Sequence, residues 1–257
     1  MALIVKKFGG SSVADVSCMR RVANRVSETV SQGHDVVVVV SAMGKTTDNL
    51  VALAQEVHGD PDDREYDMLL ASGEQISVSI LAMALHAKGV AAVSLTGPQA
   101  GIRTDDAHTR ARITDIDPEP IQSHLTEGKV VIVAGFQGLS PKRDIATLGR
   151  GGSDLSAVAL AGALKAERCQ IYTDVRDLHG RPPRGPRCPK ARGSGVRRNV
   201  GTGQFGGESA PGPVGGICKK IWGEDRGAIQ FYARSRNPGA RRGGSYGRYG
   251  IARGRLR

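Results

Sequence analysis

Short apolar runs alternate with longer amphipathic segments over residues 1–175, which is the pattern of strands that alternate with helices. The runs are brief and bounded by Gly or polar residues, so we expect strands at 3–5, 35–40, 90–95, 129–134 and 169–174. Apolar spacing predicts helices over about 15–32, 47–58, 65–88 and 153–166, the first capped by Ser11 or Ser12. Five consecutive valines at 36–40 indicate a strand buried on both faces, as in a parallel sheet covered by helices. The pattern predicts a layered α/β fold.

Polar, glycine-rich segments follow the predicted strands at three places. They read KFGGSS at 7–12, SAMGKTTD at 41–48 and, after a short connecting stretch, TLGRGGSD at 147–154, and a predicted helix follows each one. Ligands of open α/β sheets bind beyond the carboxyl ends of the strands, where helix N-termini offer N–H groups and a positive dipole. Glycines allow close approach to an anion, and Lys7 and Arg150 add positive charge. Together the segments indicate phosphate handling.

Simpler interpretations stay open for the single residues. A Gly-Gly pair after a strand is commonly a tight turn, and Lys45 by itself is typical of a solvated surface. Gly44-Lys45-Thr46 does not end a P-loop, because Val39 stands where that motif requires its first glycine. Glu74 lies in an otherwise apolar helix, where it has either a structural partner or a ligand, since an unpaired buried acid is costly.

Composition separates a tail from the rest of the chain. The 257 residues carry a formal net charge of +11, but residues 176–257 hold 19 of the 36 Lys and Arg, 4 of the 25 Asp and Glu and 19 of the 35 Gly. Apolar residues are scarce in this tail, which predicts disorder because too little surface can be buried to offset the entropy of folding. Its Arg-Gly clusters, with Tyr246 and Tyr249, resemble an RNA-binding segment.

Cellular setting follows from what the sequence lacks. No apolar run approaches the length of a membrane span, and the N-terminus is too short and wrongly charged for a signal peptide. The four cysteines form no CxxC pair and no metal-binding spacing. We therefore expect a cytoplasmic protein without a membrane partner, and we assign no residue as a metal ligand.

The ordered set of motifs resembles a known family. The segments KFGGSSV, VVVVVSAMGKTTDNL, LLASGEQISV, TLGRGGSDLSAVALA and IYTDV, in this order over residues 1–175, resemble the catalytic domain of bacterial aspartate kinases, in the amino-acid kinase superfamily. The family usually has Thr where this chain has Ser11, and both carry a hydroxyl. The resemblance implies a layered αβα sandwich with a mainly parallel central sheet, its C-terminal part incomplete in this chain. It also implies that a family protein whose sequence continues in the family's pattern to its end is an oligomer.

The resemblance further implies roles for the residues that match its motifs. Lys7 and Asp154 would be catalytic, with Lys7 against the transferring phosphoryl group and Asp154 organising the site around it. Glu74 would pair with the α-amino group of aspartate, and Arg150 would take a carboxylate in a bidentate contact. The remaining aspartate contacts would be Thr47 and Ser153. The ATP contacts would be Lys7, Phe8, Gly9, Gly10, Ser11, Thr173 and Asp174.

The implied reaction transfers the γ-phosphoryl group of ATP to the side-chain carboxylate of L-aspartate. Its product, 4-phospho-L-aspartate, enters lysine (diaminopimelate), threonine and methionine biosynthesis. The carboxylate is already ionised at pH 7, so no strong general base is needed. Catalysis then consists of positioning and of neutralising charge with Lys7, helix N-termini and Mg²⁺.

After Val175 the chain departs from the family, which continues with a stretch resembling GIYTADPR and a helix containing GAKVL. Arg176–Arg184 can be back-translated as CGG GAT CTA CAC GGC CGA CCC CCG CGG, and reading one base later gives GIYTADPR. Comparable shifted readings continue as far as Tyr232. We infer that the tail is translated out of frame. We expect the chain as written, without those segments and the last strands of the sheet, to be misfolded or at best weakly active.

Two alternative functions are weighed against aspartate phosphorylation. Another amino-acid kinase of the same fold, for instance one acting on glutamate, is disfavoured by the SGEQ and GRGGSD pair. A nucleic-acid-binding protein driven by the basic tail would show steep salt dependence. Because the tail reads as out of frame, no specific nucleic-acid partner is expected.

Overall fold

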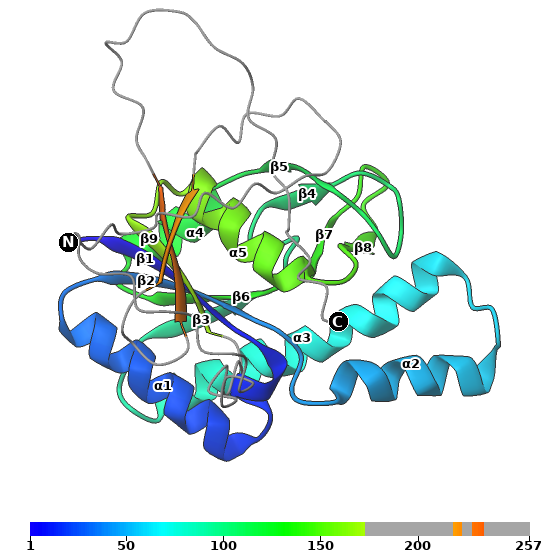
Figure 1. Ribbon diagram of the computed structural model, residues 1–257, viewed down its shortest axis with the longest axis horizontal. Helices are drawn as coiled ribbons and strands as arrows, with labels where there is room; N and C mark the ends of the chain where they lie inside the picture. The colour runs from blue at the N-terminus through cyan, green and yellow to red at the C-terminus, as the bar shows by residue number, and fades with distance from the viewer. Residues whose placement is uncertain (173–217, 223–227, 234–257) are drawn as a thin grey trace, which may run out of the picture.

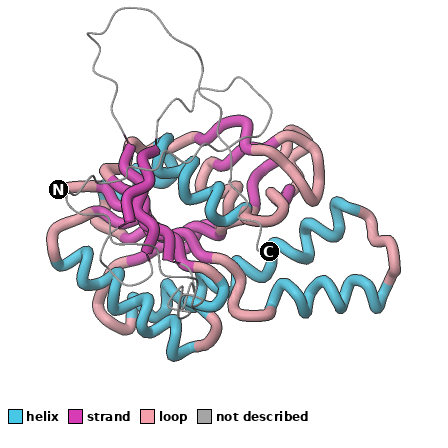
Figure 2. Tube along the Cα trace, viewed as in Figure 1, coloured by secondary structure: helices cyan, strands magenta, loops and turns pink. Residues whose placement is uncertain are grey.

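The computed structural model describes residues 1–172, 218–222 and 228–233, in which strands alternate with helices (Figures 1 and 2). The helices are α1 (Val16–Ser31), α2 (Thr46–Val57), α3 (Asp63–His86), α4 (Glu119–Thr126) and α5 (Gly152–Ala163), with a 3-10 turn η1 (Gly10–Val13). The strands are β1 (Leu3–Phe8), β2 (Asp35–Val40), β3 (Ala92–Leu95), β4 (Ile102–Thr104), β5 (Ile113–Ile116), β6 (Val130–Ala134), β7 (Gln137–Leu139), β8 (Ile145–Thr147), β9 (Arg168–Tyr172), β10 (Cys218–Trp222) and β11 (Ala228–Ala233).

A seven-stranded sheet forms the centre of the fold, in the order β10-β11-β9-β1-β2-β6-β3. The pairs from β9 to β3 are all parallel, whereas β11 joins β9 in antiparallel pairing and β10 joins β11 in the same way. The carboxyl ends of the five parallel strands therefore meet at one edge. A smaller sheet, ordered β5-β4-β7-β8, takes two strands from between β3 and β6 and two from after β6, and it packs against α3.

Helices cover both faces of the large sheet, and the valine run of β2 shows why. Val36, Val38 and Val40 pack in a core with α1 and α3, whereas Val37 and Val39 pack in a second core with α4 and α5. Alternate side chains of a strand point to opposite faces, so a strand that is apolar at every position requires cover on both. The predicted αβα sandwich with a mainly parallel sheet is confirmed (Figure 1).

Helix α3 is the longest helix of the described residues and part of the core. By length and composition alone, among the described helices, it is apolar enough to cross a membrane. Its Val78, Leu81 and Leu85 are buried in the core over the sheet, however, and the same helix buries two acids, Asp67 and Glu74. Its N-terminal part extends with α2 as a helical hairpin beyond the sheet (Figure 1).

Some predicted boundaries are wrong for local reasons. The cap of α1 is Asp15, whose carboxylate accepts a hydrogen bond from the Cys18 N–H at 2.7 Å, because η1 occupies Ser11 and Ser12 and delays the helix by one turn. The pattern also missed α4 and the whole smaller sheet. The strands of that sheet have three or four residues each, too few to show a period.

The tail contributes two strands at one edge of the large sheet, β10 and β11. This differs from the expectation that the tail is disordered and that the last strands of the sheet are missing. Ala228–Ala233 contains Ile, Phe and Tyr, types that favour strands, and the Gly- and Arg-rich average of the tail conceals them. The expectation of disorder for the rest of the tail lies outside the described residues.

Candidate active site

A cavity of about 550 Å³ opens at the carboxyl edge of the parallel strands. Its walls come from the end of β1, the loop after β4, the turns after β2, β6 and β8, the helices α2 and α3, and the first turn of α5. Six residues assigned from the sequence line it together, namely Lys7, Thr47, Glu74, Arg150, Ser153 and Asp154. Of the other lining residues, five belong to the segments from which phosphate handling is predicted, namely Ser41, Asp48, Gly149, Gly151 and Gly152. No signal in the sequence points to the remaining three, Val51, Thr109 and Phe136.

Lys7 enters the cavity from the strand β1. Strand alternation places it on the same face as Val5, which packs against α5, and its Nζ lies 2.7 Å from Asp154 Oδ1. Asp154 stands in the first turn of α5, where the helix dipole favours an acid. Only 7% of Lys7 is exposed, so its charge is poorly screened by water. A shielded cation beside a helix N-terminus is suited to neutralise a phosphoryl group.

Glu74 enters from α3 as a buried carboxylate with one oxygen unused. Its Oε1 accepts a hydrogen bond from the Ala42 N–H at 3.2 Å, whereas its buried Oε2 has no hydrogen-bond partner among the described residues. Burial raises the pKa of Glu74 to about 7, against an ordinary value of 4.5. The sequence left open whether Glu74 has a structural partner or a ligand. The Ala42 N–H is a structural partner for Oε1 only. The other oxygen is available to a cationic group in the cavity.

Arg150 lies on the turn that connects β8 to α5. The glycines on either side, Gly149 and Gly151, have φ values of +72° and +79°, a left-handed conformation that favours glycine. Arg150 is exposed and forms no ion pair with any described residue. Its guanidinium is therefore available for a carboxylate or phosphate of a ligand.

None of the residues from Phe8 to Ser11 lines the cavity. The Phe8 ring is buried on the α1 side and stacks on Tyr172 with ring centroids 4.6 Å apart. The Gly9 N–H donates to the Tyr172 carbonyl at 3.2 Å, and the Gly10 carbonyl accepts from the Gly44 N–H at 3.0 Å. The predicted contact of this segment with ATP stays a prediction. Thr173 and Asp174 lie outside the described residues.

The charges of the cavity are mixed in sign. Two cations, Lys7 and Arg150, share it with three acids, Asp48, Glu74 and Asp154. Such a lining is complementary to a small zwitterion that carries an ammonium group and more than one anionic group. No group of three or more His, Cys, Asp or Glu side chains that could hold a metal ion occurs within the described part of the chain.

The amino acid kinase family model matches residues 2–192. An aspartokinase of Geobacillus stearothermophilus is 59% identical over 184 residues, which are 72% of this chain and 45% of that protein. An aspartokinase of Mycobacterium bovis is 56% identical over 185 residues, which are 72% and 44% of the two chains. The chain thus spans less than half the length of these curated relatives.

The solved structures that resemble this chain include aspartate kinases as well. Aspartate kinase from Synechocystis is 51% identical, with a TM-score of 0.60 over 68% of this chain and 28% of that chain. E. coli aspartokinase III in complex with aspartate and ADP is 29% identical, with a TM-score of 0.61 over 67% of this chain and 49% of that chain.

Proposed function

This chain belongs to the amino acid kinase family, and we propose that it uses ATP to phosphorylate the side-chain carboxylate of L-aspartate. The observation that carries the proposal is a cavity that contains both the Lys7–Asp154 ion pair and the unused carboxylate oxygen of Glu74. The first is suited to a phosphoryl group and the second to the ammonium group of an amino acid.

The lining residues divide between the two substrates. Glu74 accepts hydrogen bonds from the ammonium group of aspartate, and Arg150 binds its α-carboxylate in a bidentate contact. Hydroxyl groups of Thr47 and Ser153 donate to the carboxylates. The side-chain carboxylate then points toward Lys7, where the γ-phosphoryl group of ATP arrives.

Phosphoryl transfer in this arrangement requires no general base, because the attacking carboxylate is ionised at neutral pH. Lys7 and the positive end of the α5 dipole neutralise the charge that spreads over the transferred group. Two carboxylates of the cavity, Asp48 and Asp154, fit the usual way of holding Mg²⁺, which takes one or two protein carboxylates together with substrate phosphates. When bound, Mg²⁺ would neutralise phosphate charge.

A coupled assay of ADP release tests this function. The chain should form ADP only when both ATP and L-aspartate are present. Glutamate, which is longer by one methylene, should be used roughly 10- to 200-fold less efficiently. Aspartate specificity is supported by relatives named aspartokinases that are 56% and 59% identical to this chain. A preference for glutamate would favour the alternative amino-acid kinase.

Substitution of Arg150 by lysine should raise KM for aspartate about 10- to 100-fold, because a point charge replaces a bidentate fork. KM for ATP should change little. Arg112, an exposed arginine that does not line the cavity, provides the control, and Arg112→Lys should leave both constants unchanged. Equal changes of KM for aspartate in the two variants would show that Arg150 does not contact the substrate.

Restoring the reading frame after Val175 should raise kcat/KM for ATP at least about 100-fold, because the restored GIYTADPR stretch would complete the positioning of the nucleotide. The comparison is between the 257-residue chain and a chain expressed from the same DNA after one base is deleted directly after the Val175 codon. An unchanged kcat/KM would show that the tail as written supports catalysis, and it would contradict the expectation that the 257-residue chain is at best weakly active.

A further inference from the structure

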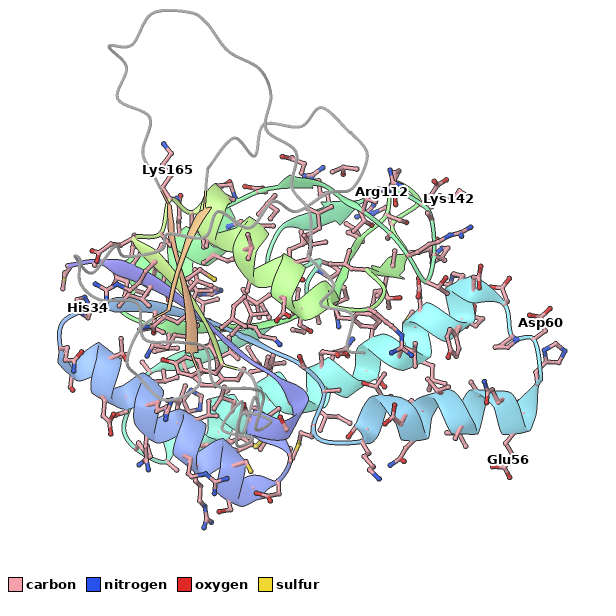
Figure 3. All side chains as sticks on the ribbon, in the orientation of Figure 1. His34, Glu56, Asp60, Arg112, Lys142 and Lys165 are labelled. Atoms are coloured by element: carbon pink, nitrogen blue, oxygen red, sulfur yellow. The ribbon has the colours of Figure 1, made fainter. Side chains whose placement is uncertain are left out.

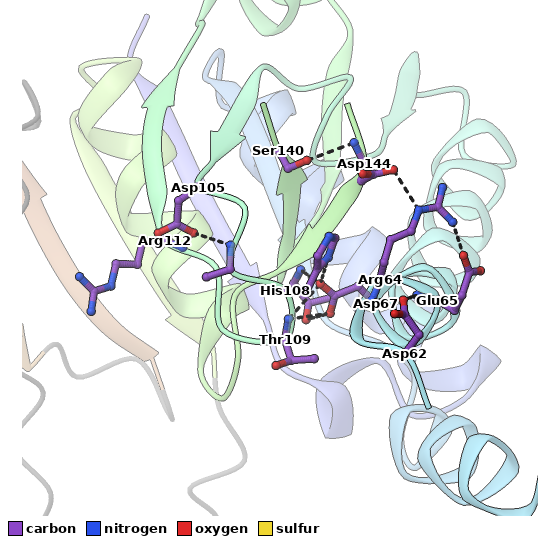
Figure 4. A network of polar contacts seen from close by, with 12 residues as sticks. Asp62, Arg64, Glu65, Asp67, Asp105, His108, Thr109, Arg112, Ser140 and Asp144 are labelled. Atoms are coloured by element: carbon purple, nitrogen blue, oxygen red, sulfur yellow. Dashed lines mark hydrogen bonds and ion pairs between the residues drawn. The ribbon is translucent and has the colours of Figure 1, made fainter. Parts of the chain in front are cut away.

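Asp67 is a buried acid on α3 that the proposed chemistry leaves without a role. Its side chain is fully inaccessible, and it precedes Glu74 by seven residues, two helical turns along the same face. It lies in the network of polar contacts drawn in Figure 4, in which α3 meets the loop after β4 and the end of β8.

The carboxylate of Asp67 joins two separate segments to α3. It accepts hydrogen bonds from the N–H groups of Thr109 and Thr147, each at 3.0 Å, and from the Thr147 hydroxyl. The His108 Nδ1 lies 2.8 Å from Oδ2. Because a carboxylate only accepts, it satisfies these donors together, whereas an amide in its place would turn an N–H₂ group toward some of them.

Both segments continue into the wall of the cavity. Thr109 itself lines the cavity, and Thr147 is followed by the turn that carries Arg150. The two segments also contact each other, since the Thr109 carbonyl oxygen lies 3.3 Å from the place a Cβ of Gly149 would occupy. Asp67 thus fixes Thr109 and the Arg150 turn relative to the helix that carries Glu74.

Thr109 has a backbone conformation that is unfavourable for a β-branched residue. Its φ is +64°, in the left-handed region, and its N–H donates to Asp67. In Figure 4 its side chain points away from that carboxylate. Such strained residues persist only where the surrounding structure holds them, and they cluster at binding sites.

We propose that Thr109 determines substrate affinity, with its hydroxyl donating to the aspartate carboxylate that Arg150 binds, and that Asp67 is the positioning residue that holds Thr109 there. The inference rests on the proposed function, because it takes aspartate as the ligand. It adds a substrate contact from a loop that carries none of the recognised motifs.

Calorimetric titration of the 257-residue chain with L-aspartate tests the contact. Thr109→Val, which keeps the shape and removes the hydroxyl, should weaken aspartate binding about 10-fold or more. Thr109→Ser, which keeps the hydroxyl, should restore binding to within about threefold of the unsubstituted chain. Asp67→Asn should weaken aspartate binding without a comparable change for ATP. Its effect should be smaller in the Thr109→Val background, since Asp67 acts partly through Thr109.

A pair of glycine substitutions separates strain from binding. Arg143, in the turn between β7 and β8, has a φ of +67° and does not line the cavity. Thr109→Gly and Arg143→Gly should both raise Tm, because glycine adopts positive φ freely, but only Thr109→Gly should weaken aspartate binding.

The outcomes distinguish the inference from the function on which it rests. If neither the 257-residue chain nor the chain with its frame restored binds aspartate, the proposed function fails and the inference with it. If either chain binds aspartate and its Thr109→Val variant binds it equally well, the inference alone is overturned. Should Asp67→Asn fail to fold, the three Thr109 variants decide the question of the contact.

Discussion

Substitution of Lys7 by methionine is expected to lower kcat about 1,000-fold, because one preorganised donor to a developing anion contributes roughly 10²- to 10³-fold and Lys7 is charged as well. The fold should be retained. Methionine fills a similar volume at this buried position, and the partner Asp154 keeps 45% of its side chain in contact with solvent. The measurement is kcat from ADP release, with the unfolding midpoint as the check on structure.

The neighbouring lysine provides the matched control. Lys6 lies in the same strand and is equally buried, at 5% exposure, but it points to the opposite face, where its Nζ lies 5.7 Å from the centre of the Tyr172 ring. Lys6→Met should therefore leave kcat within about fivefold of the original, whatever its effect on stability. A similar loss in both variants would show that Lys7 acts through the fold and not on the phosphoryl group.

Substitution of Glu74 by glutamine should stabilise the protein without ligand while it weakens aspartate binding. The pKa of Glu74 is about 7 in the folded protein, against 4.5 as the ordinary value. Between these two pH values the folded chain retains a proton that the unfolded chain releases, so the free energy of unfolding falls as pH rises. Above pH 7 the ionised Glu74 lowers the free energy of unfolding by about 3 kcal/mol relative to its value at low pH.

Glutamine carries no charge and keeps an oxygen for the Ala42 N–H. Glu74→Gln should therefore be more stable than the original by about 3 kcal/mol at pH 8, with no such gain at pH 4. Urea unfolding at the two pH values measures this difference. Glu56, an exposed glutamate at the far end of α2 (Figure 3), provides the control, and Glu56→Gln should change neither profile. An equal gain at both pH values would contradict burial of the charge as the cause.

The same carboxylate should make aspartate affinity depend on pH. Only ionised Glu74 offers a negative charge to the substrate ammonium group, so affinity should fall about tenfold for each pH unit below 7. Glu74→Gln should bind aspartate about 10- to 100-fold more weakly at pH 8 and show no such dependence. Titrations with aspartate at pH 6, 7 and 8 measure both effects.

Long elements could be predicted from the sequence because they carry a period. The valine run of β2 and the helices α1, α3 and α5 were located within a few residues. The smaller sheet was missed because its strands are too short to show alternation, and its place is fixed by contacts with α3 that are distant in sequence. The strands β10 and β11 were missed because the average composition of the tail conceals two short apolar stretches.

The site could be predicted where its residues belong to motifs at the ends of strands. Lys7 and Arg150 were assigned in this way and Glu74 as an acid in an otherwise apolar helix, and the structure places all three in one cavity. Thr109 could not be assigned, because its loop has no period and no glycine signature. Asp67 did give a signal, as a second acid seven residues before Glu74 on the same helical face, although its partners become visible only in three dimensions.

Trapping the reaction product with hydroxylamine tests the phosphorylation of aspartate most directly, because an acyl phosphate reacts with it to give a stable hydroxamate. The 257-residue chain and the chain with its frame restored should be incubated with ATP, Mg²⁺ and L-aspartate. We expect aspartyl β-hydroxamate in amounts that require ATP, that increase when the frame is restored and that disappear in Lys7→Met. Absence of hydroxamate from both folded chains, or its formation from glutamate in preference to aspartate, would contradict the proposed function.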